Sequence, residues 1–543
     1  MKLNKNLNKK ETEKMQTTMK RILLAVLVIA LTVSFCACGE KKAKETVASE
    51  EIPETLTVWS ALGGVASKVC SSNNDIMGYQ LLEELTGCHI EWIHPTKGAD
   101  VEKFNLMMAS GELPDMICYD WSVVPGGAIS FVEDEYIVEL TDYVEKYMPN
   151  FKAHGDANPN VKKQYADDEN RIYYIPFIRG DQELKVYLGP VIRTDWLEKL
   201  GLDAPKTTDD LYNVLKAFKT QDPNGNGQAD EIPMTAALFK HTSHGIGNLL
   251  WAFGTHYDFY LEDGKVKYGV LEDKFEDGLK YITKLFSEGL IDPDYILLDR
   301  NKMDAKVTAD KAGFLFGFQP TKVMGAMENV DPSFKWEGIE WLTGPDGDRK
   351  SFIPDYGKDV GYASVAITTA CKNPVGAAKW IDMLFSKEGR EYMNFGKEGV
   401  SFNYVDGEPI LTDYVLNNPD GRDKDTMKTL SIAAAESSFP TLQDWRYYKQ
   451  LLHPYGTKAI ETWVESAETD GILPPLSFSP DEKNKITKIM GQVNTYTDEL
   501  LNKIVIGEAS VSELNTMRRK IKDMGIDEIL DIYQAAYDRY NKR

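Results

Sequence analysis

The strongest constraint on the fold is an alternation of strand-like and helix-like segments along most of the chain. The stretch "ETLTVWSAL" (54–62) predicts a short strand that ends in a Gly-Gly loop. Apolar spacing at 76–85 predicts a helix that stops at Gly87, and a second strand follows at 89–93. This alternation is typical of α/β units built around a sheet, so we expect an α/β fold.

Later segments continue the alternation before the pattern changes. Further strands are predicted at 116–119, 186–192 and 361–367, and further helices at 208–218, 275–288 and 374–385. The C-terminal third is helical instead, and Ser479 with Glu482 forms the capping pattern of one helix start. Ser510 with Glu513 predicts another start, and Gly525 predicts the end of that helix. A chain of 543 residues is too long for one ordinary core, so two or three compact units are expected.

The N-terminus has the layout of a secretory signal peptide. Two basic residues precede an apolar run at 22–33, which is too short to span a bilayer comfortably. The ending "FCACG" resembles a bacterial lipobox, so 1–37 is predicted to be a signal peptide and Cys38 the lipidated residue. A polar, lysine-rich leader precedes the pattern, and translation is therefore expected to start at Met19. An uncleaved membrane anchor is the alternative.

The next segment is charged and poor in apolar residues. Residues 38–52 are therefore predicted to be a lipid-anchored tether rather than part of the fold. The whole chain has 62 Lys and Arg against 84 Asp and Glu, a formal net charge of −22. This balance argues against nucleic acid as a partner, because binding phosphates needs clustered Lys and Arg.

The cysteines show no metal-binding pattern. After the leader, the remaining four are Cys70, Cys88, Cys118 and Cys371, without a CxxC motif or other ligand-like spacing. A disulfide between Cys70 and Cys88 and buried free thiols are both open at this point.

The segment "TQDPNGNGQADEIPMT" (220–235) begins like the calcium loop of an EF-hand but does not end like one. Counted from Asp222, the first positions match, whereas position 12 falls on Pro233 instead of glutamate. The predicted metal ligands are Asp222, Asn224, Asn226, Gln228 through its carbonyl, Asp230 and Glu231. These hard oxygen ligands favour Ca²⁺ over a transition metal. A surface turn without an ion explains the same residues.

Residues at the predicted strand ends are candidates for binding a ligand. In open α/β lobes, ligands bind beyond the carboxyl ends of strands. Aromatic platforms with polar groups around them suit sugar rings, and the chain has 10 Trp and 27 Tyr. The candidates at the strand ends are Trp59, Ser60, Tyr119, Asp120 and Trp121. Arg193 and Trp251 are further candidates, although Arg193 could equally form an ion pair with Asp195 or another structural carboxylate.

No local motif predicts catalysis. A glycosidase needs two carboxyls flanking one bond, and no such pair is indicated. The chain has no G-x-S-x-G, H-E-x-x-H or Walker motif, and His241 and His244 lack a partner at ligand spacing. The chain is therefore predicted not to be an enzyme, with a polysaccharide-acting hydrolase as the rival class.

Four signatures occur in the order found in extracellular solute-binding proteins. "MASGELPDMICYD" resembles their helix that leads through Gly-x-x-Pro-Asp into a strand pointing at the ligand cleft. "GPVIRTDWLEKLGLDAPKTTDDLYNVLKAF" is similar to the start of their second lobe, and "AITTACKNPVGAAKWIDMLFSKEG" to the return to the first. "MGIDEILDIYQAAYDRY" resembles the C-terminus of large oligosaccharide-binding lipoproteins of Gram-positive bacteria. The resemblance runs from about Leu56 to Tyr540.

The resemblance implies a two-lobed, periplasmic-binding-protein-like fold of type II with a hinge and a helical C-terminal region. The first lobe would comprise 53–186 and 362–402, and the second lobe 189–360 and 405–543. Tyr362, near the second crossing, and Trp445, in an aromatic loop that matches a stacking Trp of relatives, join the ligand candidates.

The resemblance also implies a function. The protein would be a monomer that captures a carbohydrate, expected to be an oligosaccharide, and delivers it to the permease subunits of an ABC importer. A palmitate-type anchor on Cys38 would hold it at the extracellular face of a Gram-positive cell membrane. The D-x-N-x-N-G-x-x-D-E segment recurs in calcium-containing alginate-oligosaccharide-binding relatives, which implies a structural Ca²⁺. A ligand-sensing lipoprotein that partners a membrane receptor is a further alternative.

Overall fold

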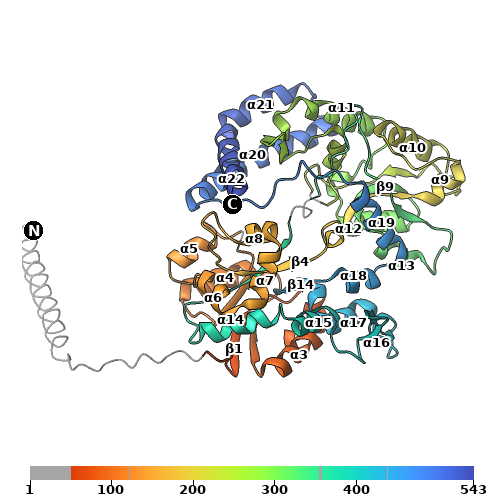
Figure 1. The fold of residues 1–543 in the computed structure, drawn as a ribbon. Helices are drawn as coiled ribbons and strands as arrows, with labels where there is room; N and C mark the ends of the chain where they lie inside the picture. The colour runs from red at the N-terminus through yellow and green to blue at the C-terminus, as the bar shows by residue number, and fades with distance from the viewer. Residues whose placement is uncertain (1–49, 122, 242, 354–357, 437) are drawn as a thin grey trace, which may run out of the picture. The chain divides into compact units, whose positions relative to one another are not determined.

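The computed structural model describes residues 50–543 except 122, 242, 354–357 and 437 (Figure 1). The predicted signal peptide, the start at Met19 and the lipidated Cys38 lie outside the described residues. Of the predicted tether, residues 50–52 are described, and the Lys379 ammonium donates a hydrogen bond to the Glu50 carbonyl at 2.7 Å. No helix in the described part of the chain is long and apolar enough to cross a membrane.

The first lobe is built on a six-stranded sheet with the order β14-β4-β11-β3-β1-β2. Its strands are β1 (Thr55–Trp59), β2 (His89–Ile93), β3 (Met116–Tyr119), β4 (Ile175–Arg179), β11 (Val360–Ile367) and β14 (Leu442–Gln443). Only β11 is antiparallel to its neighbours, so the other five strands have their carboxyl ends at one edge of the sheet. The strands predicted at 89–93 and 116–119 are confirmed, and the one at 361–367 begins one residue earlier.

Helices cover this sheet and complete its hydrophobic core. Tyr79, Leu81 and Leu82 of α3 (Met77–Thr86) are buried, and the helix ends at Gly87, whose φ of 69° lies in the left-handed region. The other main helices are α4 (Asp100–Ser110), α5 (Ala128–Glu133), α6 (Thr141–Tyr147), α7 (Pro149–Ala157), α8 (Pro159–Tyr165), α14 (Pro374–Met383) and α15 (Lys387–Phe395). The helix predicted at 76–85 and the one at 374–385 are therefore confirmed with small shifts at their ends.

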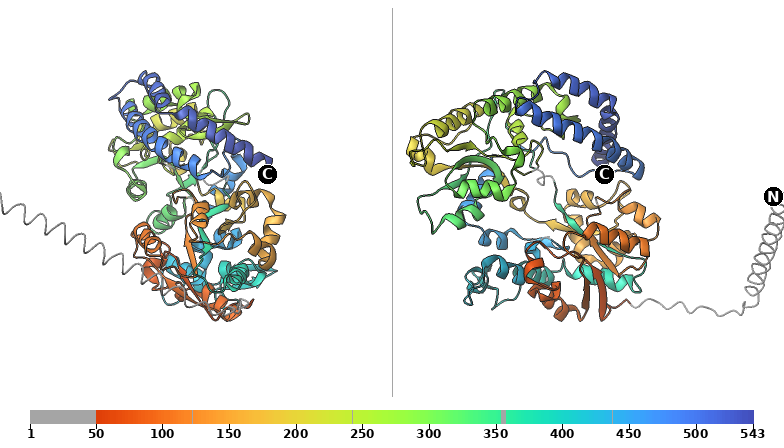
Figure 2. Two further views of the ribbon diagram at one scale, coloured as in Figure 1. Left: turned by 90° about the vertical axis from the view of Figure 1, so that its left-hand side faces the viewer. Right: turned by 180° about the vertical axis from the view of Figure 1, so that it is seen from behind.

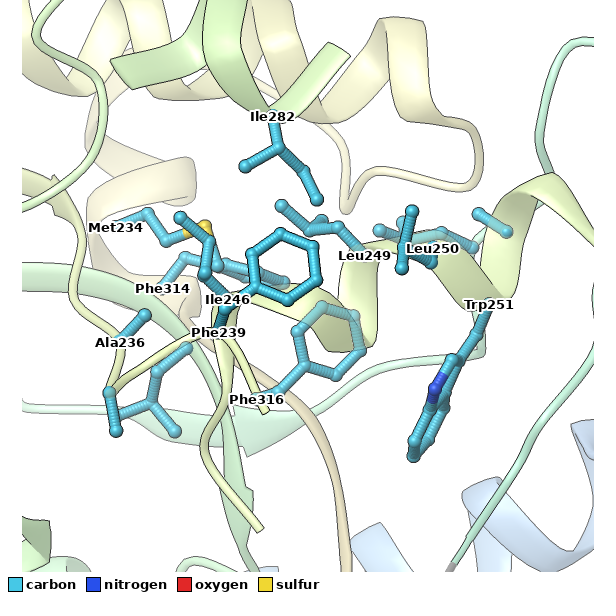
Figure 3. Close-up of a cluster of buried hydrophobic side chains, with 14 of the residues drawn as sticks. Met234, Ala236, Phe239, Ile246, Leu249, Leu250, Trp251, Ile282, Phe314 and Phe316 are labelled. Carbon is cyan, nitrogen blue, oxygen red and sulfur yellow. The ribbon is translucent and has the colours of Figure 1, made fainter. Parts of the chain in front are cut away.

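The second lobe is built on a four-stranded sheet with the order β10-β5-β9-β6. Its strands are β5 (Leu188–Arg193), β6 (Ile232–Met234), β9 (Ala312–Phe318) and β10 (Trp336–Gly338). The first helices on this sheet are α9 (Thr194–Leu200), α10 (Thr208–Thr220), α11 (Asp273–Ser287), α12 (Arg300–Thr308) and α13 (Thr321–Met327). Figure 3 shows the core, in which Ile282 of α11 faces Leu249, while Phe314 and Phe316 project from β9. The predicted strand 186–192 and helices 208–218 and 275–288 are confirmed within two residues at each end.

The C-terminal region consists of helices, as predicted, and it packs on the second lobe. These helices are α19 (Pro454–Ser466), α20 (Pro480–Val505), α21 (Glu513–Asp523) and α22 (Ile526–Lys542). Ser479 and Glu482 form the predicted capping box at the start of α20. The predicted cap Ser510 is wrong: the chain makes a further turn, and Ser512 is the residue at the N-cap position of α21.

One predicted lobe boundary differs from the structure. Residues 405–451 pack with the first lobe rather than with the second, because β14 joins the first sheet. In the same segment, Ala433 and Phe439 enter the first-lobe core, and Tyr447 of α18 (Trp445–Leu451) packs with Phe395. The final passage to the second lobe falls just before α19, whose Trp463 is fully buried in the second core.

The described residues fold as expected for the α/β, two-lobed class. The chain passes from β4 to β5, returns through β11 and crosses a third time before α19 (Figures 1 and 2). The four described cysteines are all free, so Cys70 and Cys88 do not form a disulfide.

Candidate ligand-binding cavity and calcium loop

A cavity of about 710 Å³ lies where the carboxyl end of β3 meets the C-terminal helices. Its first-lobe side is formed by 120–121, 126–129, 164–169, 171 and 173–174, together with the β11 region. Its second-lobe side is formed by the start of α20, the segment before it, and α22. The cavity therefore combines residues of both lobes.

Aromatic side chains line both sides of the cavity. Trp121, Tyr173 and Tyr174 belong to the first lobe, and Phe478 and Tyr533 belong to the second. Tyr533 is held in place on α22 by stacking on Phe259, at 4.1 Å between ring centroids, and by Phe478 at 5.0 Å. Rings on opposite sides suit a ligand with two apolar faces and polar edges, as a sugar ring has.

Trp121 reaches the cavity from a buried position. Its side chain is 2% exposed, and its indole N–H donates to the Ser364 carbonyl of β11 at 3.1 Å. Phe104 and Phe131 pack against the ring at 5.9 and 5.6 Å. Asp120, the preceding residue, also lines the cavity. Both residues were predicted from their place after β3.

An ion-pair cluster occupies the first-lobe wall. Arg171 donates to Asp167 at 2.8 Å through Nε and to Glu169 at 2.6 Å through Nη2. The Tyr173 hydroxyl donates to the same Asp167 carboxylate at 2.6 Å. Burial acts to raise the pKa of Asp167, but the hydrogen bonds from Tyr173 and Arg171 outweigh it and hold that pKa below its usual value. Burial, followed by this carboxylate, raises the pKa of Tyr173.

A second cluster joins the two lobes beside the cavity. Arg539 of α22 donates to Asp168 of the first lobe at 2.5 Å, and to Glu482 of α20 at 2.9 and 3.1 Å. Arg543 donates to the Ala166 carbonyl at 2.7 Å, so the C-terminus lies against the end of α8 (Figures 1 and 2). This cluster connects the lobes at a point outside the three crossing segments.

Lys483 of α20 reaches the same cavity from the second lobe. Burial lowers the pKa of its ammonium group, and the negative charge of Asp120 opposes that shift. An attraction therefore also links the end of β3 to α20.

The other candidates from the ends of β1 and β3 lie in the interior of the first lobe or are only partly exposed, away from the cavity lining. Trp59 is 4% exposed, and its ring contacts Tyr119 at 5.8 Å and Phe104 at 6.1 Å. Tyr119 stacks on Phe104 at 4.0 Å, and Ser60 is buried. None of the three lines the cavity, but Trp59 and Tyr119 pack in the same hydrophobic cluster as Trp121 and so support its wall from the core.

Arg193 and Trp251 are placed in the interior of the second lobe. Arg193 is 1% exposed and donates to both carboxylate oxygens of Asp195 at 2.8 and 2.6 Å. It also donates to Asp310 at 2.5 Å, so the structural ion pair is the alternative that the structure supports. Trp251 is 2% exposed and stands at the side of the second-lobe core in Figure 3, with Trp341 at 5.4 Å.

The last two ligand candidates have different positions. Trp445 is half-buried and lines a separate cavity of about 850 Å³ on the first lobe. Its backbone N–H donates to the carboxylate of Asp181, which lines the same cavity, at 2.8 Å. Tyr362 is in β11, and its side chain is outside the described residues.

The sequence did not single out the second-lobe wall. Phe478, Lys483, Tyr533 and Arg539 come from the helical C-terminal region, far from the strand ends that directed the prediction. The capping pattern at Ser479 placed the start of α20 correctly but could not show that this start faces the first lobe.

The predicted calcium loop connects α10 to β6. Asp222 has a φ of 48°, and its carboxylate accepts hydrogen bonds from the N–H groups of Asn226 at 3.1 Å and Gly227 at 3.0 Å. The Asn224 amide oxygen accepts from the same Asn226 N–H at 3.0 Å. Side-chain oxygen atoms of its first half therefore hold the turn of the loop by accepting hydrogen bonds from its backbone.

The second half of the loop supplies carboxylates. Asp230 accepts from the Asn226 amide at 3.0 Å and pairs with the Lys311 ammonium at 3.0 Å. The Oε1 atom of Glu231 is buried without a hydrogen-bond partner in the described structure. Burial raises the pKa of Glu231, and the nearby charges of Asp222 and Asp230 raise it further. A buried, unpaired carboxylate oxygen beside two other carboxylates fits a cation.

Carboxylate side chains alone would not make a complete calcium site in this loop. Among residues 50–543, the gaps aside, no three His, Cys, Asp or Glu side chains come together as a metal cluster. A cation here would also need the amide and carbonyl oxygens of the loop, which are the hard ligands that Ca²⁺ takes.

The chain belongs to the family of bacterial extracellular solute-binding proteins. The family model matches residues 79–391, which is more than half of the chain. The match begins in α3 and ends in α15, so it includes the return through β11.

Three relatives illustrate the similarity. The chain is 29% identical, over 95% of its length and 97% of the relative, to the fructooligosaccharide ABC transporter substrate-binding protein FusA of Streptococcus pneumoniae. It is 31% identical to the lipoprotein LipO of Bacillus subtilis, over 62% of this chain and 66% of LipO.

A structure of FusA in complex with kestose has a TM-score of 0.71 at 26% identity, covering 90% of this chain and 99% of that one. FusA has also been solved as an EF-hand mutant, with the same identity and TM-score. The alginate-binding protein AlgQ2 without calcium ion has a TM-score of 0.70 at 25% identity, covering 90% and 100%.

Proposed function

We propose that this chain captures an oligosaccharide in the cavity between β3 and the C-terminal helices and delivers it to the permease subunits of an ABC importer. The observation that carries the proposal is the arrangement of aromatic rings from both lobes around a cavity of about 710 Å³. Relatives named for fructooligosaccharide and alginate binding support a carbohydrate ligand. The proposed role is that of a binding protein rather than an enzyme, because the relatives are named as substrate-binding proteins.

The geometry of the cavity supports a specific set of ligand contacts. Asp120 and Trp121 are proposed to contact the ligand from the first lobe, and Tyr533 and Phe478 from the second. Trp59 and Tyr119 support this wall through the hydrophobic cluster that they share with Trp121, and Ser60 is buried at the end of β1. Binding of the ligand to both walls would draw the two lobes together, because each lobe contributes part of the lining.

Ligand binding should raise the thermal stability of the full chain. At a saccharide concentration of 100 times Kd, the expected stabilisation is about 2.7 kcal/mol. The measurement is a thermal-shift screen over neutral and acidic oligosaccharides that includes kestose, followed by titration calorimetry. Analysis of the recovered sugars should find them uncleaved.

Variants on α22 locate the site. Tyr533→Ala should weaken binding about tenfold, because packing of a sugar face on the tyrosine ring is expected to contribute about 1.4 kcal/mol. Tyr537→Ala removes a tyrosine one turn further along the same helix that does not line the cavity, and it should leave affinity unchanged. Equal losses in both variants would place the ligand elsewhere.

The protein is proposed to be a monomer held at the extracellular face of the membrane by a palmitate-type lipid on Cys38. The lipobox-like "FCACG" and the similarity to LipO support this address. A Cys38→Ala variant should move from the membrane fraction to the soluble fraction. Retention of the variant in the membrane would favour the uncleaved apolar segment as the anchor.

A structural Ca²⁺ is the proposed cofactor of the second lobe. Its ligands would come from Asp222, Asn224, Asn226, the Gln228 carbonyl, Asp230 and Glu231. Bound there, the ion supplies positive charge to the carboxylates and fixes the connection between α10 and β6.

A further inference from the structure

We propose that the cavity selects neutral saccharides over saccharides that carry carboxylates, because its own carboxylates already neutralise the cationic side chains that line it. The inference rests on the proposed function, since it names the class of ligand for that same cavity. It starts from the four cationic residues of the lining, which are Arg171, Lys358, Lys483 and Arg539.

Arg539 has almost no donor left for a ligand. A guanidinium group has five N–H donors. Nε donates to Asp168 at 2.5 Å, Nη1 to Glu482 at 3.1 Å, and Nη2 to Glu482 at 2.9 Å and to the Ser477 carbonyl at 3.2 Å. Two carboxylates therefore compensate its charge, and a ligand carboxylate would have to displace one of them.

Arg171 is compensated in the same way. Its guanidinium contacts Asp167 at 2.8 Å through Nε and at 2.7 Å through Nη2, and Glu169 at 2.6 Å. The planar fork of arginine is the group that recognises carboxylates in two-point contacts, and here protein carboxylates already use it.

The two lysines also face protein carboxylates. Lys483 interacts electrostatically with Asp120, and both residues line the cavity. Lys358 interacts electrostatically with Asp258 of the second lobe. Neither ammonium group is therefore available as an uncompensated charge.

The net charge of the side chains that line the cavity is negative. Five carboxylates, those of Asp120, Asp167, Asp168, Glu169 and Glu482, accompany the four cations. An acidic saccharide would lose the hydration of its carboxylates and enter a site whose nearest charges are of the same sign or already paired. Hydroxyl groups need no such exchange, because they can accept from a paired cation and donate to a paired carboxylate at once.

The test compares saccharides that differ only in charge. The full chain is titrated with 1,4-linked tetramers of galactose, glucose and mannose and with the corresponding tetramers of their uronic acids. The methyl esters of the uronic acid tetramers are included, because they keep the ring, the linkage and the exocyclic carbon while removing the charge. Kestose serves as an additional neutral probe.

The outcomes separate the inference from the proposed function. A rise in melting temperature with neutral sugars or esters, and affinities at least tenfold weaker for the matched acids, would support the inference. Equal or tighter binding of an acid would overturn it while leaving saccharide capture intact. No binding by any saccharide would overturn both.

A charge variant tests the cause. Glu482→Gln keeps an acceptor for the capping hydrogen bond from Ser479 but removes one negative charge beside Arg539. The ratio of acid to neutral affinity should rise about fivefold. Glu528→Gln, which removes an exposed carboxylate paired with Lys485 outside the cavity lining, should leave the ratio unchanged. An unchanged ratio in Glu482→Gln would show that the lining charges do not set selectivity.

Discussion

Replacing Arg193 with methionine should lower the free energy of unfolding by about 3–5 kcal/mol while leaving saccharide affinity unchanged. The loss is large because the substitution leaves the carboxylates of Asp195 and Asp310 without their shared partner. The guanidinium also lies 4.0 Å from the Phe334 ring centroid, so packing is lost with the charge. Equilibrium denaturation of the full chain measures the first effect, and calorimetric titration with a bound saccharide measures the second.

Arg446 provides the matched control. It also forms a two-point contact with an aspartate, Asp444, but its side chain is 46% exposed. Arg446→Met should therefore cost no more than about 1 kcal/mol, since water screens an exposed pair. Adding Asp195→Asn to Arg193→Met should restore part of the lost stability, because one of the two stranded charges is removed. A stable Arg193→Met variant with greatly weakened saccharide binding would instead show that Arg193 is a ligand-binding residue.

Arg193 also shows what the sequence can and cannot decide about a site. The motif "VIRTDW" shows that Asp195 is near in sequence, but Asp310, which follows α12, enters the cluster only through the antiparallel pairing of β5 with β9. Local spacing therefore left two roles open for one arginine. The tertiary contact with a residue more than 100 positions away distinguishes them.

The fold was more predictable than the site because its signals are local. The helix at α3 follows from apolar spacing and from Gly87, and both act within about ten residues. The assignment of 405–451 to the wrong lobe has the opposite cause. Nothing in that segment marks its place beside β4, which depends on the pairing of the two-residue strand β14.

The ligand cavity was partly predictable from local sequence signals. The rule that ligands lie beyond the carboxyl ends of strands selected Asp120 and Trp121, and both line the cavity. The same rule selected Trp59, whose ring is covered by Phe104 and Tyr119, and Ser60, which is also buried. The opposite wall, with Tyr533 on α22, depends on how the C-terminal helices approach the first lobe, and no local pattern encodes that approach.

Removing calcium should lower the stability of the second lobe by a similar amount to the Arg193 substitution. At free Ca²⁺ of 1,000 times Kd, bound ion contributes about 4 kcal/mol. The physical basis is the Glu231 carboxylate, which has a buried oxygen without a donor and lies near the charges of Asp222 and Asp230. The measurement is a melting curve of chelator-stripped protein titrated with Ca²⁺, and with Mg²⁺ for comparison. Mg²⁺ should give a smaller shift, because it requires near-ideal octahedral geometry.

Two variants assign that effect to the loop. Asp222→Asn combined with Glu231→Gln should abolish the calcium-dependent shift, whereas Asp346→Asn, at an exposed carboxylate of the same lobe, should keep it. Lys311→Met removes the cation that pairs with Asp230 at 3.0 Å. Because a bound divalent ion would compensate the same carboxylates, this variant should melt earlier in chelator and recover most of the difference when Ca²⁺ is added. A melting temperature that ignores Ca²⁺ in the unaltered protein would instead identify the loop as a turn that the Lys311 pair and its own N–H groups stabilise without any ion.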